Sequence, residues 1–352
     1  MNSNVPKPDQ NQTLPYEKHA IESPYRAVIT GIEAHIPEYV LTNDELSTMV
    51  DTTDEWIMSR VGIKERHILK EDGLGISHMA AIAVKKLLES TGTNPDEVDM
   101  LMCATVSPDM LFPASANIIS DKAGILNAWG YDINAGCSGF IFSFDTIRTY
   151  IEIGRYKKAI LVCAERMSGM TDYTDRATCP LFGDAAVAML IEPTTDKSIG
   201  FQDSILRVDG IGRHYLYQTA GGSLYPPSER TIKERLHYIH QDGQPVFKYA
   251  VSNMADVSVE IMEKNNLTAD DIAYLIPHQA NLRIIDATGR RMGISNNKIL
   301  INIEKFGNTS GTSIPLAIWD FRSKFKKGDT LIFSAFGAGF TWGSIYYKWG
   351  IN

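Results

Sequence analysis

One cysteine of the chain lies in a setting that suits a nucleophile. Cys137 occurs in INAGCSGF, after a short apolar run and directly before an amphipathic helix pattern. A thiol at a helix N-terminus lies near the positive end of the helix dipole, which lowers its pKa and favours the reactive thiolate. The two glycines and the serine around it leave room for a substrate to reach the sulfur. The alternative for any cysteine is a buried structural thiol, and that alternative suits the remaining three, Cys103, Cys163 and Cys179.

A histidine and an asparagine lie in comparable positions. His278 follows the apolar run AYLIP and opens a loop, which is where α/β proteins tend to place site residues. Asn308, in FGNTSGTS, precedes another helix pattern, although asparagine is also common as an ordinary turn or N-cap residue. Each residue alone is a weak signal. Together, Cys, His and Asn beside apolar strands indicate a thiol-based catalytic site.

Short apolar runs alternate with longer amphipathic runs from residue 25 onward, which is typical of an α/β protein. We predict strands at residues 27–33, 100–106, 130–134, 158–164, 186–191, 273–277, 330–335 and 344–349. We predict helices at residues 42–50, 77–91, 114–123, 140–154, 246–266, 282–292 and 315–325. The polar stretch 207–244 carries Gly and Pro, and we expect an irregular surface excursion there.

Two stretches of the chain follow the same order of elements. The segment from Gly136 has a small-residue turn, an amphipathic helix, a Lys-Lys turn and an apolar strand, and the segment from Gly307 repeats this order. We therefore predict a duplicated fold whose two halves bring related turns to one central site. In this alignment Cys137 and Asn308 hold matching places.

The composition limits the classes of function. The chain has 352 residues, 44% hydrophobic residues and a formal charge of −8, which fits one large or two fused globular domains. The negative balance argues against a general nucleic-acid or anionic-membrane surface. The four cysteines show no C-x-x-C spacing, so we expect neither a metal site nor a disulfide framework. The first 24 residues have no apolar core, so we expect a mobile tail, no signal peptide and a cytoplasmic protein.

The chain also resembles a known family, the β-ketoacyl-[acyl-carrier-protein] synthase III enzymes of the thiolase superfamily, which initiate bacterial type II fatty acid synthesis. The resemblance runs from about Tyr25 to Trp349. Its motifs are TTDEWIMSRVGIKERHI, AGCSGF, TDRATCPLFGDAAVAM, PHQANLR, GNTSGTS and FGAGFTWG. It implies two βαβαβαββ halves in a five-layered αβαβα sandwich, residues 25–199 and 200–352, and a homodimer.

The resemblance also implies roles in a decarboxylating Claisen condensation. Cys137 accepts the acyl group of a short acyl-CoA, and His278 and Asn308 serve the condensation with malonyl-acyl carrier protein. The backbone amides of Cys137 and Ala338 form the oxyanion hole. The family commonly has glycine at position 338, and alanine is tolerable there if its φ is negative. No cofactor or metal is implied.

The resemblance places the two thioester substrates as well. It assigns CoA to Thr52, Trp56, Arg60 and Arg176, with the adenine stacked between Trp56 and Arg176. An acidic carrier protein is assigned to a patch formed by Lys248, Gln279, Ala280, Asn281, Leu282, Arg283, Arg290 and Arg291. Phe112 matches the position where the partner subunit closes the acyl pocket, and its large ring favours a short primer such as acetyl. The simpler interpretations are a helix anchor for Trp56 and solvated helix charges for the basic residues.

Several related activities remain as alternatives. Degradative thiolases have a second cysteine in the C-terminal glycine turn, which FGAGF lacks, and elongating synthases have a second histidine where this chain has Asn308. Plant-type polyketide synthases share Cys-His-Asn, but TTDEWI and GIKERHI favour the initiating enzyme. A condensing enzyme of secondary metabolism (of quinolone, resorcinol or polyene type) stays open. A non-catalytic partner subunit also stays open, although such subunits usually lose the nucleophile.

Overall fold

The computed structural model describes residues 23–351. The mobile tail predicted for residues 1–24 therefore lies outside the described residues, except for Ser23 and Pro24. Ser23 is hydrogen-bonded through its hydroxyl to the backbone carbonyl of Glu152. None of the helices within residues 23–351 is long and apolar enough to cross a membrane.

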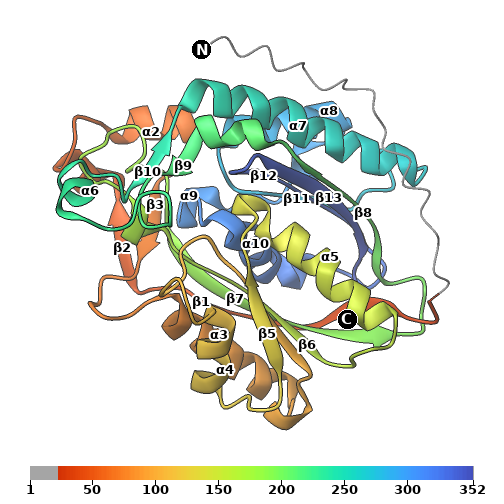
Figure 1. The fold of residues 1–352 in the computed structure, drawn as a ribbon. Coiled ribbons are helices and arrows are strands. Elements are labelled where there is room, and N and C mark those ends of the chain that lie inside the picture. The colour runs from red at the N-terminus through yellow and green to blue at the C-terminus, as the bar shows by residue number, and fades with distance from the viewer. Residues whose placement is uncertain (1–22, 352) are drawn as a thin grey trace.

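The chain forms five layers, with a pair of helices between two sheets and a further pair outside each sheet (Figure 1). One outer layer holds α3 (Ile76–Thr91) and α4 (Ser115–Ala123), and the other holds α7 (Gly243–Lys264) and α8 (Leu282–Met292). The central layer holds α5 (Gly139–Glu152) and α10 (Ser313–Phe321). The predicted αβαβα sandwich is confirmed.

The two sheets repeat one topology. The first has the order β1-β7-β6-β4-β5, formed by β1 (Arg26–His35), β7 (Asp184–Thr194), β6 (Ala159–Arg166), β4 (Met100–Ala104) and β5 (Trp129–Ile133). The second has the order β8-β13-β12-β11, formed by β8 (Gly200–Val208), β13 (Thr341–Lys348), β12 (Thr330–Gly337) and β11 (Tyr274–Pro277). In the first sheet β5 pairs with the edge of β4. At the equivalent edge of the second sheet, Leu275 of β11 forms an isolated parallel bridge with Ile299. The proposed domain boundary at residues 199/200 falls in the turn between β7 and β8, and it stays a prediction.

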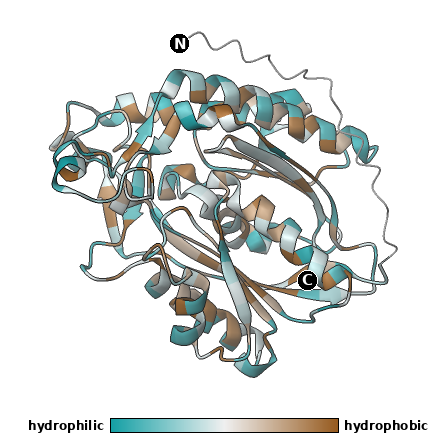
Figure 2. Ribbon diagram, in the orientation of Figure 1, coloured by the Kyte–Doolittle hydropathy of each residue, from teal (hydrophilic) through white to brown (hydrophobic). Residues whose placement is uncertain are grey.

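Burial explains why these segments are so apolar. Every residue of β4 and β12 is buried, as expected for strands covered by helices on both faces. Phe140, Phe144 and Ile147 of α5 lie in the same apolar cluster as Ile314 and Ile318 of α10. Figure 2 shows the hydrophobic colour concentrated in the strands and inner helices, with hydrophilic residues along α7.

The structure corrects the alignment of the repeats. A short 3-10 helix precedes each central helix: η2 (Gly136–Ser138) before α5 and η6 (Ser310–Thr312) before α10. Gly136 and Ser310 open these turns with φ values of 55° and 51°. By this geometry Cys137 matches Gly311, and Asn308 lies two residues before the matching turn. The sequence alignment was off by three residues because it started both segments at a glycine.

Most predicted elements occur within a few residues of their expected bounds. The helix expected at residues 315–325 instead ends at Phe321 and is followed by a 3-10 turn, η7 (Arg322–Lys324). The expectation of an irregular excursion at residues 207–244 is wrong in part, because that stretch contains a hairpin and a short helix: β9 (Leu216–Gln218), β10 (Ile239–Gln241) and α6 (Glu229–Lys233). The helix predicted from Thr42 is only α1 (Asn43–Ser47). The edge strand β8 of the second sheet was not predicted, and four further short elements also have no predicted counterpart: β2 (Tyr39–Thr42), α2 (Asp54–Val61), β3 (Glu65–Ile68) and α9 (Ile303–Phe306).

Candidate active site

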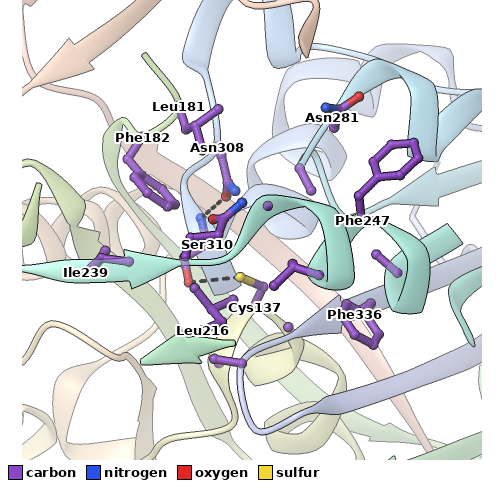
Figure 3. A pocket seen from close by; sticks show the side chains of 18 of the residues that line it. Cys137, Leu181, Phe182, Leu216, Ile239, Phe247, Asn281, Asn308, Ser310 and Phe336 are labelled. Carbon is purple, nitrogen blue, oxygen red and sulfur yellow. Dashed lines mark hydrogen bonds between the residues drawn. The ribbon is translucent and has the colours of Figure 1, made fainter. Parts of the chain in front are cut away.

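Cys137, His278 and Asn308 line one cavity of about 770 Å³, although they come from distant parts of the sequence. Cys137 lies in the turn before α5, His278 directly follows β11, and Asn308 lies shortly before η6. Figure 3 shows Cys137 and Asn308 on either side of Ser310, whose hydroxyl and amide interact with them. The structure therefore brings the three predicted residues together.

Backbone contact between two turns shapes the site around the thiol. A Cβ on Gly337 would lie 2.4 Å from the Cys137 amide nitrogen, and a Cβ on Gly136 would lie 2.7 Å from the Ala338 nitrogen. Only glycine permits approaches this close. Ala338 is not among the residues with positive φ, so the condition for alanine there is met. The Ala338 amide interacts with the Cys137 sulfur.

Burial has the largest effect on the pKa of the Cys137 thiol. Burial raises the pKa of Cys137 to about 11, although the Ser310 hydroxyl and the amides of Ala338 and Cys137 act to lower it. The amides at the helix start thus act in the expected direction, but burial outweighs them, so the pKa of the resting thiol is raised and not lowered. The side chain is surrounded by protein but keeps part of its surface open to the cavity. Attack on a substrate thus needs an acceptor for the thiol proton.

His278 is held neutral and oriented by a serine. Its side chain is 1% exposed, and burial lowers its pKa to about 3. The Ser313 hydroxyl lies 2.7 Å from His278 Nδ1, and the same oxygen accepts the Gln279 amide at 3.2 Å. We assign the Ser313 proton to the bond with His278 Nδ1, so that Nδ1 accepts and Nε2 carries the ring hydrogen. Neutral His278 therefore offers an N–H donor from Nε2.

Hydrogen bonds hold the backbone and the side-chain oxygen of Asn308 in place and leave its carboxamide nitrogen, Nδ2, able to donate into the cavity. Its backbone is held from both sides, since its amide donates to the Leu181 carbonyl at 2.8 Å and its carbonyl accepts from Gly183 at 3.1 Å. Its Oδ1 accepts the Ser310 amide at 2.8 Å. Nδ2 has no hydrogen-bond partner within residues 23–351, and the residue lines the cavity. Asn308 is therefore a second neutral N–H donor beside the thiol.

Only some of the residues predicted to bind CoA line the cavity. Trp56 and Arg60 of α2 line it, and the Arg176 guanidinium lies 4.6 Å from the Trp56 ring centre. Arg176 and Thr52 are absent from the lining, and Thr52 is buried. A purine stacked between Trp56 and Arg176 needs about 7 Å between them, twice an ordinary contact distance, so these two side chains must separate to admit it.

The predicted carrier-protein residues divide into exposed and buried ones. Arg283 lines the cavity mouth and lies 4.8 Å from the Phe247 ring centre. Lys248, Arg290 and Arg291 are exposed on α7 and α8. Among the remaining members of the patch, Ala280 and Asn281 also line the cavity, and Leu282 is half-buried.

Gln279 corrects the prediction for this patch. Its side chain is 1% exposed and donates to the carbonyls of Pro277 and Leu300 while accepting the amides of Asn302 and Ile303. It therefore joins the loop after β11 to the start of α9, and it does not reach the surface. We leave it out of the carrier-protein patch.

Comparison with known proteins decides the family. The model for 3-oxoacyl-[acyl-carrier-protein] synthase III matches residues 131–210, and the model for its C-terminal part matches residues 262–349. The chain is 56% identical over 326 residues to β-ketoacyl-[acyl-carrier-protein] synthase III 2 of Bacteroides thetaiotaomicron, covering 93% of this chain and 97% of the relative. It belongs to the β-ketoacyl-[acyl-carrier-protein] synthase III family. It is therefore a condensing acyltransferase of fatty acid synthesis.

Solved synthase III structures share the fold. The enzyme of Thermus thermophilus is 36% identical with a TM-score of 0.84, covering 92% of this chain and 99% of that one. The enzyme of Aquifex aeolicus is 34% identical with a TM-score of 0.83, covering 92% and 100%. The thiolase-like fold predicted from the motifs is thus confirmed.

Phe112 lies apart from the synthase cavity of its own chain. It is 83% exposed and does not line the cavity, and the neighbouring Leu111 and Met110 are 77% and 50% exposed. Three exposed apolar side chains in succession are unusual for a loop that faces only solvent.

Two residues that the sequence did not single out support this synthase site. Ser310 contacts the thiol at 3.6 Å, and Ser313 orients His278. Both lie in the quoted motif GNTSGTS, but nothing local distinguishes a serine that contacts a catalytic group from an ordinary turn serine.

Proposed function

We propose that the protein joins a short acyl-CoA, with acetyl-CoA as the preferred primer, to malonyl-acyl carrier protein. The products are 3-ketoacyl-acyl carrier protein, CO₂ and CoA. One observation carries this proposal: a single cavity presents a partly open thiol, Cys137, together with two neutral N–H donors, His278 Nε2 and Asn308 Nδ2. That set suits acyl storage followed by stabilisation of an enolate.

The first half-reaction transfers the acyl group to Cys137. The sulfur attacks the thioester carbon, and the carbonyl oxygen gains negative charge as the tetrahedral adduct forms. The amides of Cys137 and Ala338 are the proposed donors to that oxygen, since the close backbone approach at Gly337 keeps the two turns in register. Collapse of the adduct expels the CoA thiolate and leaves a neutral acyl-Cys137 thioester.

The second half-reaction uses His278 and Asn308. Loss of CO₂ from the malonyl group leaves an electron pair that is shared with the thioester oxygen as an enolate. Two neutral donors can hold this oxygen, and neither gives up its proton, because burial keeps His278 uncharged and the carboxamide of Asn308 does not ionise. The enolate carbon then attacks acyl-Cys137, forms the new C–C bond and releases the thiolate.

The two substrates are proposed to enter through one mouth between α2 and α8. The Asn281 side chain donates to the Arg60 carbonyl at 3.1 Å, which ties the two helices together beside the cavity. Trp56, Arg60, Arg176 and Thr52 are the proposed CoA contacts. The proposed surface for an acidic carrier protein consists of Arg283, Lys248, Arg290 and Arg291, with Ala280, Asn281 and Leu282 near the mouth. The positive charges of this surface, on an otherwise acidic enzyme, would attract the carrier protein to the cavity.

We also propose a homodimer in which Phe112 closes the acyl pocket of the partner subunit. The support is its position outside its own cavity at the tip of an exposed apolar loop. A phenyl ring at the end of the pocket favours a short primer. We further propose that residues 25–199 and 200–352 are the two evolutionary halves. A cytoplasmic location is proposed because acyl-CoA and acyl carrier protein are made there.

The test is intact-mass analysis of the enzyme after incubation with a panel of acyl-CoAs, followed by malonyl-acyl carrier protein. We expect the acyl mass to appear with acetyl-CoA, to be absent in Cys137→Ala, and to disappear again when malonyl-acyl carrier protein is added. The buried Cys103→Ala variant is the matched control and should be acylated as the wild type is. Acylation of Cys137→Ala at the wild-type rate would refute the proposal, and preference for a long or aromatic acyl-CoA would favour a secondary-metabolite enzyme.

A further inference from the structure

The mechanism above does not use Arg66, a cation buried inside the protein. Arg66 lies in β3 and is 0% exposed. Burial lowers its pKa to about 10, so the guanidinium stays charged near neutral pH. Within residues 23–351 its hydrogen-bond partners are all neutral oxygens, and it forms no ion pair. A buried charge without a counter-charge is costly, so its presence there calls for a reason.

The guanidinium of Arg66 bridges two parts of the chain. Nη1 donates to the Leu41 carbonyl at 3.1 Å and to Asn43 Oδ1 at 2.9 Å, and Nη2 donates to the Pro180 carbonyl at 2.7 Å. Hydrogen bonds from a charged donor are roughly twice as strong as those between neutral groups. Arg66 therefore fastens Pro180 to the junction of β2 and α1.

This junction is itself held firmly. Asn43 is 2% exposed, and its Nδ2 donates to Asp54 Oδ1 and to the Ile63 carbonyl, both at 2.8 Å. Asp54 is the first residue of α2, and Ile63 follows the end of that helix. Through Arg66, Pro180 is thus held at a fixed place relative to α2.

The residues that follow Pro180 hold the backbone of Asn308. The Leu181 carbonyl accepts the Asn308 amide at 2.8 Å, and the Gly183 amide donates to the Asn308 carbonyl at 3.1 Å. Phe182, between them, forms an isolated parallel bridge with Asn308, and Figure 3 shows its side chain beside that of Asn308. The position of Asn308 therefore depends on that of residues 180–183.

The aliphatic stem of Arg66 packs against the same bridge. A Cβ on Gly183 would lie 3.2 Å from Arg66 Cβ, and a Cβ on Gly307, next to Asn308, would lie at the same distance. This separation is shorter than ordinary van der Waals contact, so the stem of Arg66 fits closely against both glycines. Arg66 thus supports Asn308 in two ways, through this close packing and through its bond to Pro180.

We propose that Arg66 is a positioning residue for Asn308, because its stem and guanidinium fix residues 180–183 and thereby the point from which Asn308 Nδ2 donates. This inference rests on the proposed function, because it concerns a donor to the enolate. Arg66 does not line the cavity, so it acts on the reaction through Asn308.

Other segments hold the other two site residues. The His278 amide donates to the Ser334 carbonyl at 2.8 Å, and its ring is bonded to Ser313. Cys137 lies in η2, which packs against β12. Loss of the Arg66 guanidinium should therefore displace Asn308 relative to His278 and Cys137. A displacement of about 1 Å can lower a rate roughly 100-fold, and the step affected is the one that needs Asn308 Nδ2.

The experiment measures the two half-reactions separately in Arg66→Met, which keeps an unbranched side chain and removes the guanidinium. Acyl transfer from saturating acetyl-CoA is followed by rapid quench and intact mass. Decarboxylation is followed as CO₂ release from malonyl-acyl carrier protein by enzyme already acylated on Cys137. We expect CO₂ release to fall about 100-fold while acyl transfer stays near the wild-type rate. A role in folding alone would lower both rates together, in proportion to the fraction of folded enzyme.

The matched control is Arg166→Met. Arg166 is half-buried, and its guanidinium also donates to two backbone carbonyls, but these belong to Leu69 and Leu74 before α3. Its loss should lower the free energy of unfolding and leave the ratio of the two half-reaction rates as in the wild type. Arg66→Lys carries the test if Arg66→Met does not fold. It keeps the charge but offers one nitrogen where the guanidinium offers two, so it should also lower CO₂ release selectively.

Asn308→Ala separates this inference from the proposed function. We expect it to lose CO₂ release. If it does so while the folded Arg66 variant keeps wild-type CO₂ release, or loses both half-reactions equally, Arg66 is not a positioning residue for Asn308. A selective loss of CO₂ release in Arg166→Met would also overturn the inference. If Asn308→Ala itself keeps wild-type CO₂ release, the role of Asn308 in the proposed function is wrong, and the role of Arg66 falls with it.

Discussion

The charge state of His278 can be tested through the stability of the protein. Its pKa is lowered from 6.5 to about 3 because the ring is fully buried. In the unfolded chain the ring takes up a proton as the pH falls through 6.5, whereas in the folded protein it does not until about pH 3. The unfolded state thus binds more protons in this window. Stability contributed by neutral His278 is present above pH 6.5 and is lost as the pH falls toward 3.

The magnitude follows from the size of this shift. Each unit of difference in pKa corresponds to about 1.4 kcal/mol, so between about pH 8 and pH 5 His278 should destabilise the folded protein by about 2 kcal/mol. The limit, reached below pH 3 where both states are protonated, is about 5 kcal/mol. His278→Asn lacks a titrating ring, so its free energy of unfolding should fall about 2 kcal/mol less than that of the wild type over the same interval.

The assay is urea unfolding at several pH values, with all variants at one protein concentration because association shifts apparent stability. Comparing each variant with itself across pH cancels the loss of packing that the substitution causes. His214→Asn, at an exposed position, is the control and should follow the wild type. If His278→Asn and the wild type lose the same stability between pH 8 and 5, His278 is protonated in the folded protein, and its assignment as a neutral N–H donor is wrong.

The remaining predictions concern the division of labour among the site residues. His278→Ala and Asn308→Ala should abolish malonyl decarboxylation and leave acyl transfer to Cys137 largely intact, because their donors serve the enolate; equal loss of both half-reactions would contradict this. Arg283→Glu should raise KM for malonyl-acyl carrier protein about tenfold and weaken its salt dependence. Trp56→Ala should raise KM for acyl-CoA by a comparable factor with little effect on the carrier protein. Steady-state kinetics with both substrates varied would show whether the two effects separate.

The order of most elements, and a set of candidate catalytic residues that the structure brings to one cavity, could be predicted from the sequence because their signals are local. Apolar runs such as that of β12 mark buried strands, and Cys137 lies in a small-residue turn between a strand and a helix. The short elements α2 and β3 gave no such signal, since α2 buries only Ile57. Their structure depends on packing against other elements. Gly62, at the end of α2, lies so close to Leu282 that a Cβ on Gly62 would be 2.8 Å from the Leu282 side chain.

The errors concern properties that depend on three-dimensional surroundings. The thiol pKa of Cys137 was predicted from one local cause, the helix start, whereas burial by distant segments determines its direction. Gln279 belongs to a loop motif and was expected on the surface, but three of its four side-chain hydrogen bonds join segments more than twenty residues apart in sequence.

The two equivalent turns present different side chains to the cavity. The turns η2 and η6 are equivalent, and their first residues, Gly136 and Ser310, share a left-handed backbone. The position that holds Cys137 in one turn holds Gly311 in the other, where a Cβ would already lie 3.4 Å from the Gly136 oxygen and 3.6 Å from the Gly139 Cα. A Cβ at position 311 would therefore be in van der Waals contact with the first turn, which shows how closely the two turns pack at this point. The second turn presents the Ser310 hydroxyl, which lies 3.6 Å from Cys137 Sγ, so the two equivalent turns bring different side chains to one place in the cavity.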